Sequence, residues 1–333
     1  MNAITENEIQ SRLAALDALR SALAQAIVGQ ESIVEQLLIG LLAGGHCLLE
    51  GVPGLGKTLL VRSLGEALHL QFRRVQFTPD LMPSDILGTE LLEEDHGTGK
   101  RAFRFQPGPV FTNLLLADEL NRTPPKTQAA LLEAMQERTV SYAGVTHALP
   151  RPFFVLATQN PLEQAGTYPL PEAQLDRFLL HIHVDYPSET EEKAILLQTT
   201  GSGSSTVPRV MEGEEVLALQ QLVRDVHVGD DLLAWITRLV RASRPGENTS
   251  EEVRSHVNKY VKWGAGPRAG QSLVLASKAR ALLHGRLAAT RDDVAALATP
   301  VMRHRLLLSF AAEAEQKNAD DVVAALLRAV PFT

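Results

Sequence analysis

The sequence predicts an α/β protein in which a parallel β-sheet domain is followed by a helical domain. Five short apolar runs alternate with segments of helical periodicity, and they lie at 46–50, 73–77, 113–118, 153–158 and 178–184. Such alternation is typical of a parallel sheet covered on both faces. Near residue 199 the stretch TTGSGSSTVP ends this rhythm, and helical patterns follow. We therefore expect an α/β domain at 1–200 and an all-α domain at 201–333.

Two helices are expected before the first apolar run. Residues 5–27 place Ile9, Leu13, Leu16, Leu19 and Leu23 on one face of a helix. The segment Val28-Gly29-Gln30 interrupts this pattern, and a second helix follows it.

Two insertions interrupt the alternation of strands and helices. Residues 87–108 read as two strands around a Gly-rich turn, and residues 138–149 read as a hairpin that turns at Ala143-Gly144. The basic residues of the first insertion are opposed by acidic ones, which is the pattern of a solvated hairpin.

Composition makes several classes of protein less favoured, although a local basic channel for nucleic acid stays possible. Apolar residues make up 45% and charged residues 21% of the chain, and the net charge is −7, which argues against a surface that grips nucleic acid along its whole length. Cys47 is the only cysteine, so no internal disulfide and no cysteine-based metal site is expected. No signal peptide and no apolar stretch of about 18 residues is apparent. We expect a cytoplasmic protein without direct membrane insertion.

A glycine-rich turn follows the first apolar run and opens a helical pattern. It reads Gly51-Val52-Pro53-Gly54-Leu55-Gly56-Lys57-Thr58, which fits G-x-x-x-x-G-K-[ST]. Such a turn points backbone N–H groups at phosphate oxygens, and the helix N-terminus adds partial positive charge. Lys57 would reach the β- and γ-phosphates and Thr58 would bind Mg²⁺. The alternative, a tight turn with a chance lysine, does not explain the flanking strand and helix.

Three further side chains supply what hydrolysis of a triphosphate needs. Asp118 and Glu119 end the third run, where Asp118 would hold Mg²⁺ and Glu119 would act as general base. Asn160 ends the fourth run and would orient the attacking water. Each has a simpler interpretation, as solvated acids or an Asn-Pro turn, when taken alone.

Arg177 precedes the fifth run, and its guanidinium suits a γ-phosphate because it is planar and always charged. An ordinary surface ion pair with Asp176 or Glu172 is the alternative.

This ordered set of motifs resembles the AAA+ ATPases. The resemblance implies a P-loop core with the sheet order 5-1-4-3-2 and an α-helical lid. In the stretch GAGPRAGQS, Arg268 looks like the second sensor of the family. The resemblance also implies that residues 28–30 line the adenine pocket and that the nucleotide contacts continue along the loop to Leu59.

Several phrases narrow the resemblance to the MoxR family. They include LLEGVPGLGKT, FTPDLMPSDILG, LLLADELNRTPPKTQAALLEAMQE and LATQNPLEQAGTYPLPEAQLDRF. The insertions resemble the helix-2 insert and the pre-sensor-1 hairpin of a clade that includes magnesium chelatases. The resemblance implies an ATP- and Mg²⁺-dependent hexamer that assembles, activates or inserts metal into partner proteins, together with a von Willebrand factor A domain partner. It also implies that Arg177 acts on the ATP of a neighbouring subunit, whereas Arg268 serves either its own site or the next one.

Two other functions stay open at the level of sequence. A DNA or RNA translocase of the same clade would need basic or aromatic hairpin tips, and the second hairpin offers only Tyr142. A nucleotide-gated scaffold would not need Glu119 and Asn160.

Overall fold

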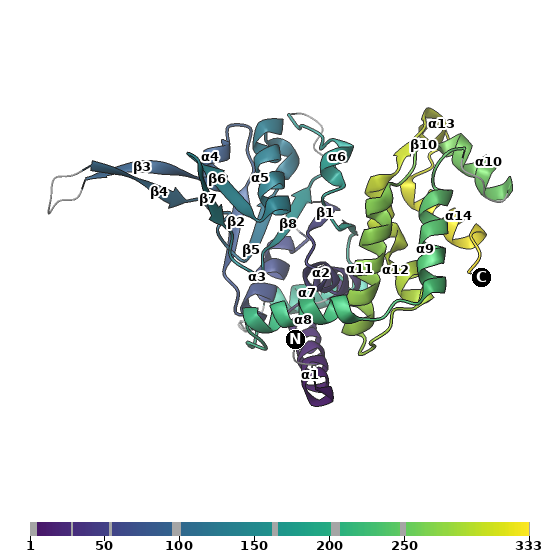
Figure 1. Ribbon diagram of the computed structural model, residues 1–333, viewed down its shortest axis with the longest axis horizontal. Helices are drawn as coiled ribbons and strands as arrows, with labels where there is room; N and C mark the ends of the chain where they lie inside the picture. The colour runs from purple at the N-terminus through teal and green to yellow at the C-terminus, as the bar shows by residue number, and fades with distance from the viewer. Residues whose placement is uncertain are drawn as a thin grey trace.

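The structure is a computed structural model, and it describes residues 5–27, 29–52, 55–94, 101–161, 166–200, 207–246 and 251–332. A central sheet with its covering helices forms one half of the molecule, and a helical lid forms the other (Figure 1). Within the described residues, no helix is long and apolar enough to span a membrane.

The central sheet has the predicted topology. Its strands are β1 (Cys47–Gly51), β2 (Phe72–Gln76), β5 (Leu114–Asp118), β8 (Phe154–Gln159) and β9 (Leu180–Val184). Their order across the sheet is β2-β5-β8-β1-β9, and every pairing is parallel. Counted along the chain, this is the order 5-1-4-3-2, so the prediction is confirmed.

Helices cover both faces of the sheet, as continuous apolar strands require. Leu49 and Leu116 pack on one face with helices that precede or follow β1, namely α1 (Glu6–Ala26), α2 (Glu31–Leu42) and α3 (Lys57–Ala67). Leu48 and Ala117 pack on the other face with α4 (Pro83–Leu87) and α5 (Pro125–Glu137). Strands β1, β5, β8 and β9 are therefore largely shielded from water, whereas β2 at one side of the sheet stays partly exposed.

Both predicted insertions are antiparallel hairpins. The first consists of β3 (Gly88–Glu94) and β4 (Arg101–Pro107), and the second of β6 (Thr139–Tyr142) and β7 (Val145–Ala148). The first projects far from the core (Figure 1). The hairpins meet at its base, where the rings of Phe105 and His147 stack with centroids 4.2 Å apart.

The lid is mainly helical. After α6 (Glu172–Leu175) and β9, α7 (Glu189–Thr200) is the last helix of the region expected to form the core. The helices that follow are α8 (Gly213–Asp225), α9 (Asp230–Ala242), α10 (Glu251–Tyr260), α11 (Pro267–Leu283), α12 (Arg291–Met302), α13 (Phe310–Ala314) and α14 (Ala319–Ala329). The expectation of an all-α region needs one correction, because β10 (Val261–Trp263) pairs with β11 (Leu307–Leu308). Two or three residues that pair across more than forty positions leave no periodic pattern to read.

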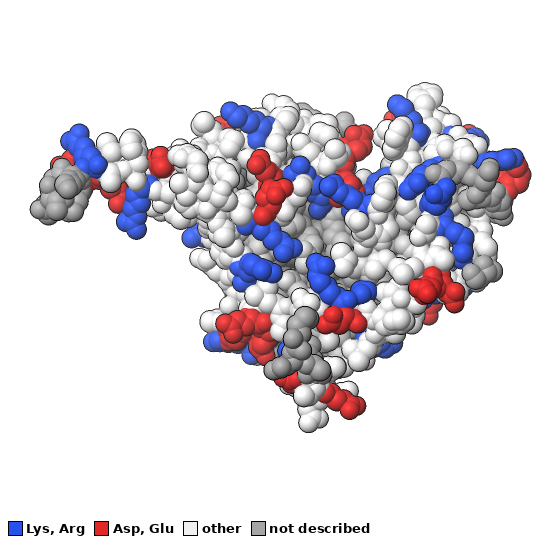
Figure 2. Space-filling model, in the orientation of Figure 1, with Lys and Arg blue, Asp and Glu red and all other residues white. Residues whose placement is uncertain are grey.

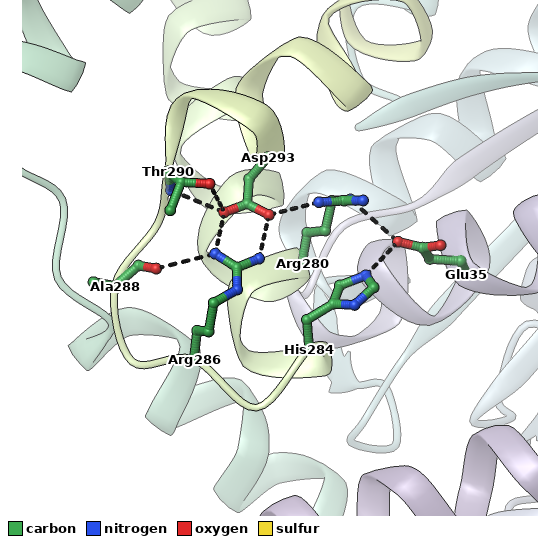
Figure 3. A network of polar contacts seen from close by, with 7 residues as sticks. All are labelled: Glu35, Arg280, His284, Arg286, Ala288, Thr290 and Asp293. Carbon is green, nitrogen blue, oxygen red and sulfur yellow. Dashed lines mark hydrogen bonds and ion pairs between the residues drawn. The ribbon is translucent and has the colours of Figure 1, made fainter.

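The lid and the core share one hydrophobic cluster and several polar contacts. The cluster runs from Leu49 of β1 to Leu273 of α11 without a break. Glu35 of α2 accepts from Arg280 of α11 and contacts His284, the residue that follows α11 (Figure 3), with N–O distances of 3.1 and 2.9 Å. The buried Asp293 of α12 binds the same Arg280, so the polar network continues into the lid.

Candidate active site

The glycine-rich turn joins β1 to α3, as the motif requires. Gly56 precedes the first helical residue and has a φ of 73°, a left-handed conformation that glycine adopts without strain. Lys57 Nζ donates to the backbone oxygen of Gly51 at 2.5 Å, so the lysine folds back across the loop. Pro53 and Gly54 were also predicted to contact nucleotide, but they lie outside the described residues.

A cavity of about 250 Å³ lies between this turn and the carboxyl ends of the neighbouring strands. It contains eight predicted residues, which are Gly51, Leu55, Gly56, Lys57, Thr58, Asp118, Glu119 and Asn160. Asn160 is buried, with 6% of its surface exposed. The order of strands brings these groups together, because β8 lies between β5 and β1. The cavity therefore combines a phosphate-type loop with two carboxylates and an amide.

The acidic pair is held in place by a buried threonine on β8. The Thr158 hydroxyl donates to Asp118 Oδ1 at 2.6 Å and accepts from the backbone N–H of Glu119 at 2.8 Å. Glu119 itself has a φ of 56°, a strained conformation for a residue with a side chain. The threonine thus fixes both the carboxylate of Asp118 and the backbone turn that presents Glu119.

Two residues of β2 line the cavity and were missed by sequence reasoning. Arg74 donates to Asp118 Oδ2 from Nη2 at 2.6 Å, and Gln76 Nε2 donates to Glu119 Oε2 at 2.6 Å. They are two positions apart, so they lie on the same face of the strand. Gln76 stands opposite Asp118 in the register of β2 and β5. In the stretch RRVQF, Arg74 and Gln76 were polar residues on one face of a predicted strand. Their contact with the acidic pair could be inferred only once the strand order was known.

The pKa of Lys57 depends on its burial and on the neighbouring carboxylates. Partial burial lowers the pKa of Lys57, while the carboxylates of Asp118, Glu119 and Glu50 oppose that shift. A buried ammonium is stabilised when an anion replaces the lost water. The lysine is therefore suited to bind an incoming phosphate.

The donor set also fits a hard cation. Thr58 and Asp118 line the same cavity and offer hydroxyl and carboxylate oxygens, which are the ligands that Mg²⁺ prefers. Asp118 Oδ2 accepts from Arg74 in this structure, so a cation there would compete with the guanidinium.

The expected adenine residues adjoin the loop. Gln30 donates from Nε2 to the Leu55 oxygen at 3.2 Å. A Cβ on Gly29 would lie 2.5 Å from Oε1 of Glu191, so α7 closes over this segment. Val28 lies outside the described residues. Two other predicted contacts are not part of the cavity: Val52 lines an adjacent one, and Leu59 is a solvent-exposed residue of α3.

Arg177 and Arg268 are absent from the lining of this cavity. Both line another cavity of about 230 Å³, together with His46, Met135, Gln136 and Asp176. Arg177 donates to the Leu132 oxygen at 2.7 Å, and Arg268 forms an ion pair with Asp176 at 3.2 Å. His46 precedes β1 and Arg177 precedes β9, so the arginines lie where these strands begin. The phosphate-type loop lies where β1 ends, about 13 Å further along the strand at 3.3 Å per residue.

Comparisons with known proteins agree with this arrangement. Residues 46–180 match the ATPase family associated with various cellular activities (AAA), and residues 253–326 match an AAA lid domain. The chain is 43% identical to chaperone MoxR1 of Mycobacterium tuberculosis, over 91% of this chain and 78% of that protein.

More distant relatives and a solved structure cover nearly the whole chain. Protein MoxR of Paracoccus denitrificans is 33% identical over 88% of each chain. A crystal structure of a protein from Cytophaga hutchinsonii superposes with a TM-score of 0.91, at 38% identity and over 98% of each chain. The chain therefore belongs to the MoxR family of AAA+ ATPases.

Proposed function

We propose that this protein hydrolyses ATP at boundaries between subunits of a ring and uses the energy to remodel partner proteins. The observation that carries the proposal is that the candidate catalytic residues are divided between two separate cavities. One holds Lys57, Asp118, Glu119 and Asn160, and the other holds Arg177 and Arg268. The arginines lie where the strands begin, whereas the loop lies where β1 ends. They would therefore serve the triphosphate of an adjacent subunit.

Each residue has a chemical role in this proposal. Backbone N–H groups of the loop and Lys57 bind the phosphates. Glu119 accepts a proton from the attacking water, which Asn160 orients. Thr58 and Asp118 would hold Mg²⁺, which offsets negative charge on the β- and γ-phosphates when it is bound with the nucleotide. Arg177 of the neighbour, with Arg268 beside it, stabilises charge that develops during transfer.

Mixing two inactive variants tests this proposal. Glu119→Gln and Arg177→Ala should each lose at least about 100-fold in kcat, since a general base contributes 10²–10⁴-fold and a catalytic arginine 10³–10⁵-fold. In rings assembled from equal amounts of both, about a quarter of the boundaries combine an intact Glu119 with an intact Arg177. ATPase activity should therefore return on mixing. Co-assembly without any recovery would contradict the boundary site.

The chaperone-like role rests on the relatives, one of which is named a chaperone. We propose a client protein complex and a partner with a von Willebrand factor A domain. A Glu119→Gln variant that holds ATP should retain both during purification. Retention equal to that of Lys57→Ala, which should not hold ATP, would contradict an ATP-dependent interaction.

Movement along nucleic acid is less compatible with the charge distribution. On the projecting hairpin, Arg101 pairs with Glu94 at 2.9 Å and Arg104 with Glu93 at 3.3 Å. Figure 2 shows both signs of charge on that hairpin. Single-stranded DNA should therefore leave the ATPase rate unchanged, and a several-fold stimulation would favour a translocase.

A further inference from the structure

A second group of potential ligands lies next to the phosphate-type loop, on the side chains of Glu50, His181 and His183. Glu50 belongs to β1 and both histidines belong to β9. In the register of these parallel strands, Leu48 stands opposite His181 and Glu50 stands opposite His183. Side chains two positions apart share one face of a strand. The three groups therefore converge on one face of the sheet, while Leu180 and Ile182 pack on the other.

Their distances are those of groups that could share one ion. Glu50 Oε2 lies 2.8 Å from His181 Nε2 and 3.6 Å from His183 Nε2. One ligand atom from each residue falls within 4.8 Å of the other two. Ligands about 2.0–2.2 Å from a tetrahedral ion lie roughly 3.3–3.6 Å from one another. Only small side-chain adjustments are needed to reach this geometry.

The ring of His181 is only partly satisfied by the described residues. The residue is 9% exposed, and its Nε2 faces Glu50 Oε2 at 2.8 Å, whereas Nδ1 has no hydrogen-bond partner within the described part of the chain. Buried polar atoms are almost always satisfied, so this ring nitrogen calls for an explanation. Burial also lowers the pKa of His181, whereas its contact with Glu50 opposes that shift.

The other two ligands are accessible from solvent. The side chain of His183 is 44% exposed and that of Glu50 is 31% exposed. Both line a cavity of about 200 Å³ that also includes Gly51 and Tyr186. An ion could enter from this side, and a water molecule could complete its coordination. Two imidazole nitrogens and one carboxylate oxygen suit Zn²⁺, Co²⁺ or Ni²⁺ better than Mg²⁺.

We propose that Glu50, His181 and His183 form a binding site for one divalent transition-metal ion of the zinc type. The strand that carries both histidines also contacts the lid, because Arg303 beside α12 donates to the backbone oxygen of His181 at 3.3 Å. Glu50 directly precedes the first glycine of the loop. An ion would cross-link β1 to β9 at the entrance to the nucleotide cavity and would withdraw the Glu50 charge from Lys57.

The test measures metal binding to the full-length, tag-free protein without nucleotide, so it is independent of ATPase activity. Titration with Co²⁺ should produce the visible absorption of a nitrogen- and oxygen-coordinated ion at one ion per chain. Zn²⁺ should bleach this signal, and millimolar Mg²⁺ should not. His183→Gln should weaken Co²⁺ binding at least tenfold, and because His183 is exposed the variant should fold normally.

The matched control is His69→Gln. His69 Nδ1 lies 2.9 Å from Glu212 Oε2, so it forms a similar histidine–glutamate pair. No third metal-type ligand joins that pair among the described residues. Binding that is unaffected by His69→Gln and weakened by His183→Gln supports the site. Absence of Co²⁺ binding, or equal binding by the wild type and His183→Gln, would overturn it.

Discussion

The buried hydroxyl of Thr158 holds both acidic residues of the candidate active site, Asp118 and Glu119. Thr158→Val keeps the volume but removes the bonds to Asp118 and to the N–H of Glu119. We expect kcat to fall about tenfold or more and the free energy of unfolding to fall by about 1–3 kcal/mol, since polar groups lose their partner. ATPase kinetics and urea denaturation measure the two effects.

Thr112→Val is the matched control for that substitution. Thr112 is also fully buried, and its hydroxyl donates to the Gln71 oxygen at 2.7 Å, far from the cavity. It should lose stability without losing kcat relative to its folded fraction. If the two variants lower kcat equally, Thr158 has no positioning role.

A second prediction at this scale concerns the buried carboxylate of Asp293. Both of its oxygens accept from Arg286, at 2.7 and 2.6 Å, and Arg280 donates to one of them at 2.7 Å (Figure 3). Asp293→Ala should cost about 3 kcal/mol, the low end for breaking a buried pair, because both guanidinium groups retain some solvent contact. Asp292→Ala removes an exposed neighbour and should cost less than about 0.5 kcal/mol.

This network also predicts a pH dependence. Burial alone would raise the pKa of Asp293, but the bonds from Arg286, Thr290 and Arg280 outweigh it and lower the pKa to about 2. A carboxyl group whose pKa is lower in the folded state stabilises the fold above its unfolded pKa of 3.8. That stabilisation disappears as the pH falls from about 4 to 2. The stability gap between wild type and Asp293→Asn should shrink over this interval, and a constant gap would contradict the assignment.

At the scale of elements, one arginine joins the lid to the start of β9. The side chain of Arg305 is 3% exposed, and it donates to Asp176 Oδ1 and to the Phe178 oxygen, both at 2.7 Å. Asp176→Asn removes the carboxylate and leaves this guanidinium uncompensated. We expect a loss of about 3–5 kcal/mol in thermal or urea unfolding. Asp185→Asn, at an exposed position after β9, should be nearly neutral.

The projecting hairpin should be dispensable for folding. Among the described residues outward of Phe105, β3 and β4 pair with each other alone, and Leu92 and Phe103 are more than half exposed. Replacing residues 91–104 by a short Gly-containing turn should change Tm by less than about 3 °C. Phe105→Ala, which removes the ring stacked on His147, should cost about 1–2 kcal/mol. A truncated protein that unfolds more easily than Phe105→Ala would show that the outer hairpin contributes to the fold.

The elements also show what the sequence could and could not predict. Strands β1, β5, β8 and β9 were predictable because buried parallel strands carry apolar runs, and the loop was predictable because glycine and lysine spacing is constrained by phosphate geometry. Strand β2 gave a weaker signal, since it is partly exposed and carries polar residues. The contacts of Arg74 and Gln76 with the acidic pair were not, since they depend on which strand lies beside which. The approach of Glu50 to His181 depends on register in the same way. The β10–β11 pair was too short to carry a pattern.

For the whole molecule, the proposed function predicts that activity depends on assembly. If each site needs an arginine from a neighbour, the ATPase rate per chain should fall on dilution as rings dissociate. The rate and the mass measured by light scattering should decline together. Arg62→Ala, which removes an exposed i,i+4 ion pair with Glu66 on α3, is a control that should leave both curves in place. A constant rate across dissociation would contradict the boundary site.

Under the proposed function, the placement of the loop and the paired arginines at opposite ends of the same strands determines how copies would join. A two-fold dimer sets like surfaces against each other, so it leaves donor and acceptor faces mismatched. If the arginines serve a neighbour, copies would associate head to tail, and an open row would leave one loop without arginines and one pair of arginines without a loop. In a closed ring, every loop would have a pair of arginines from a neighbour. All active sites would thus be complete only when the last subunit closes the ring.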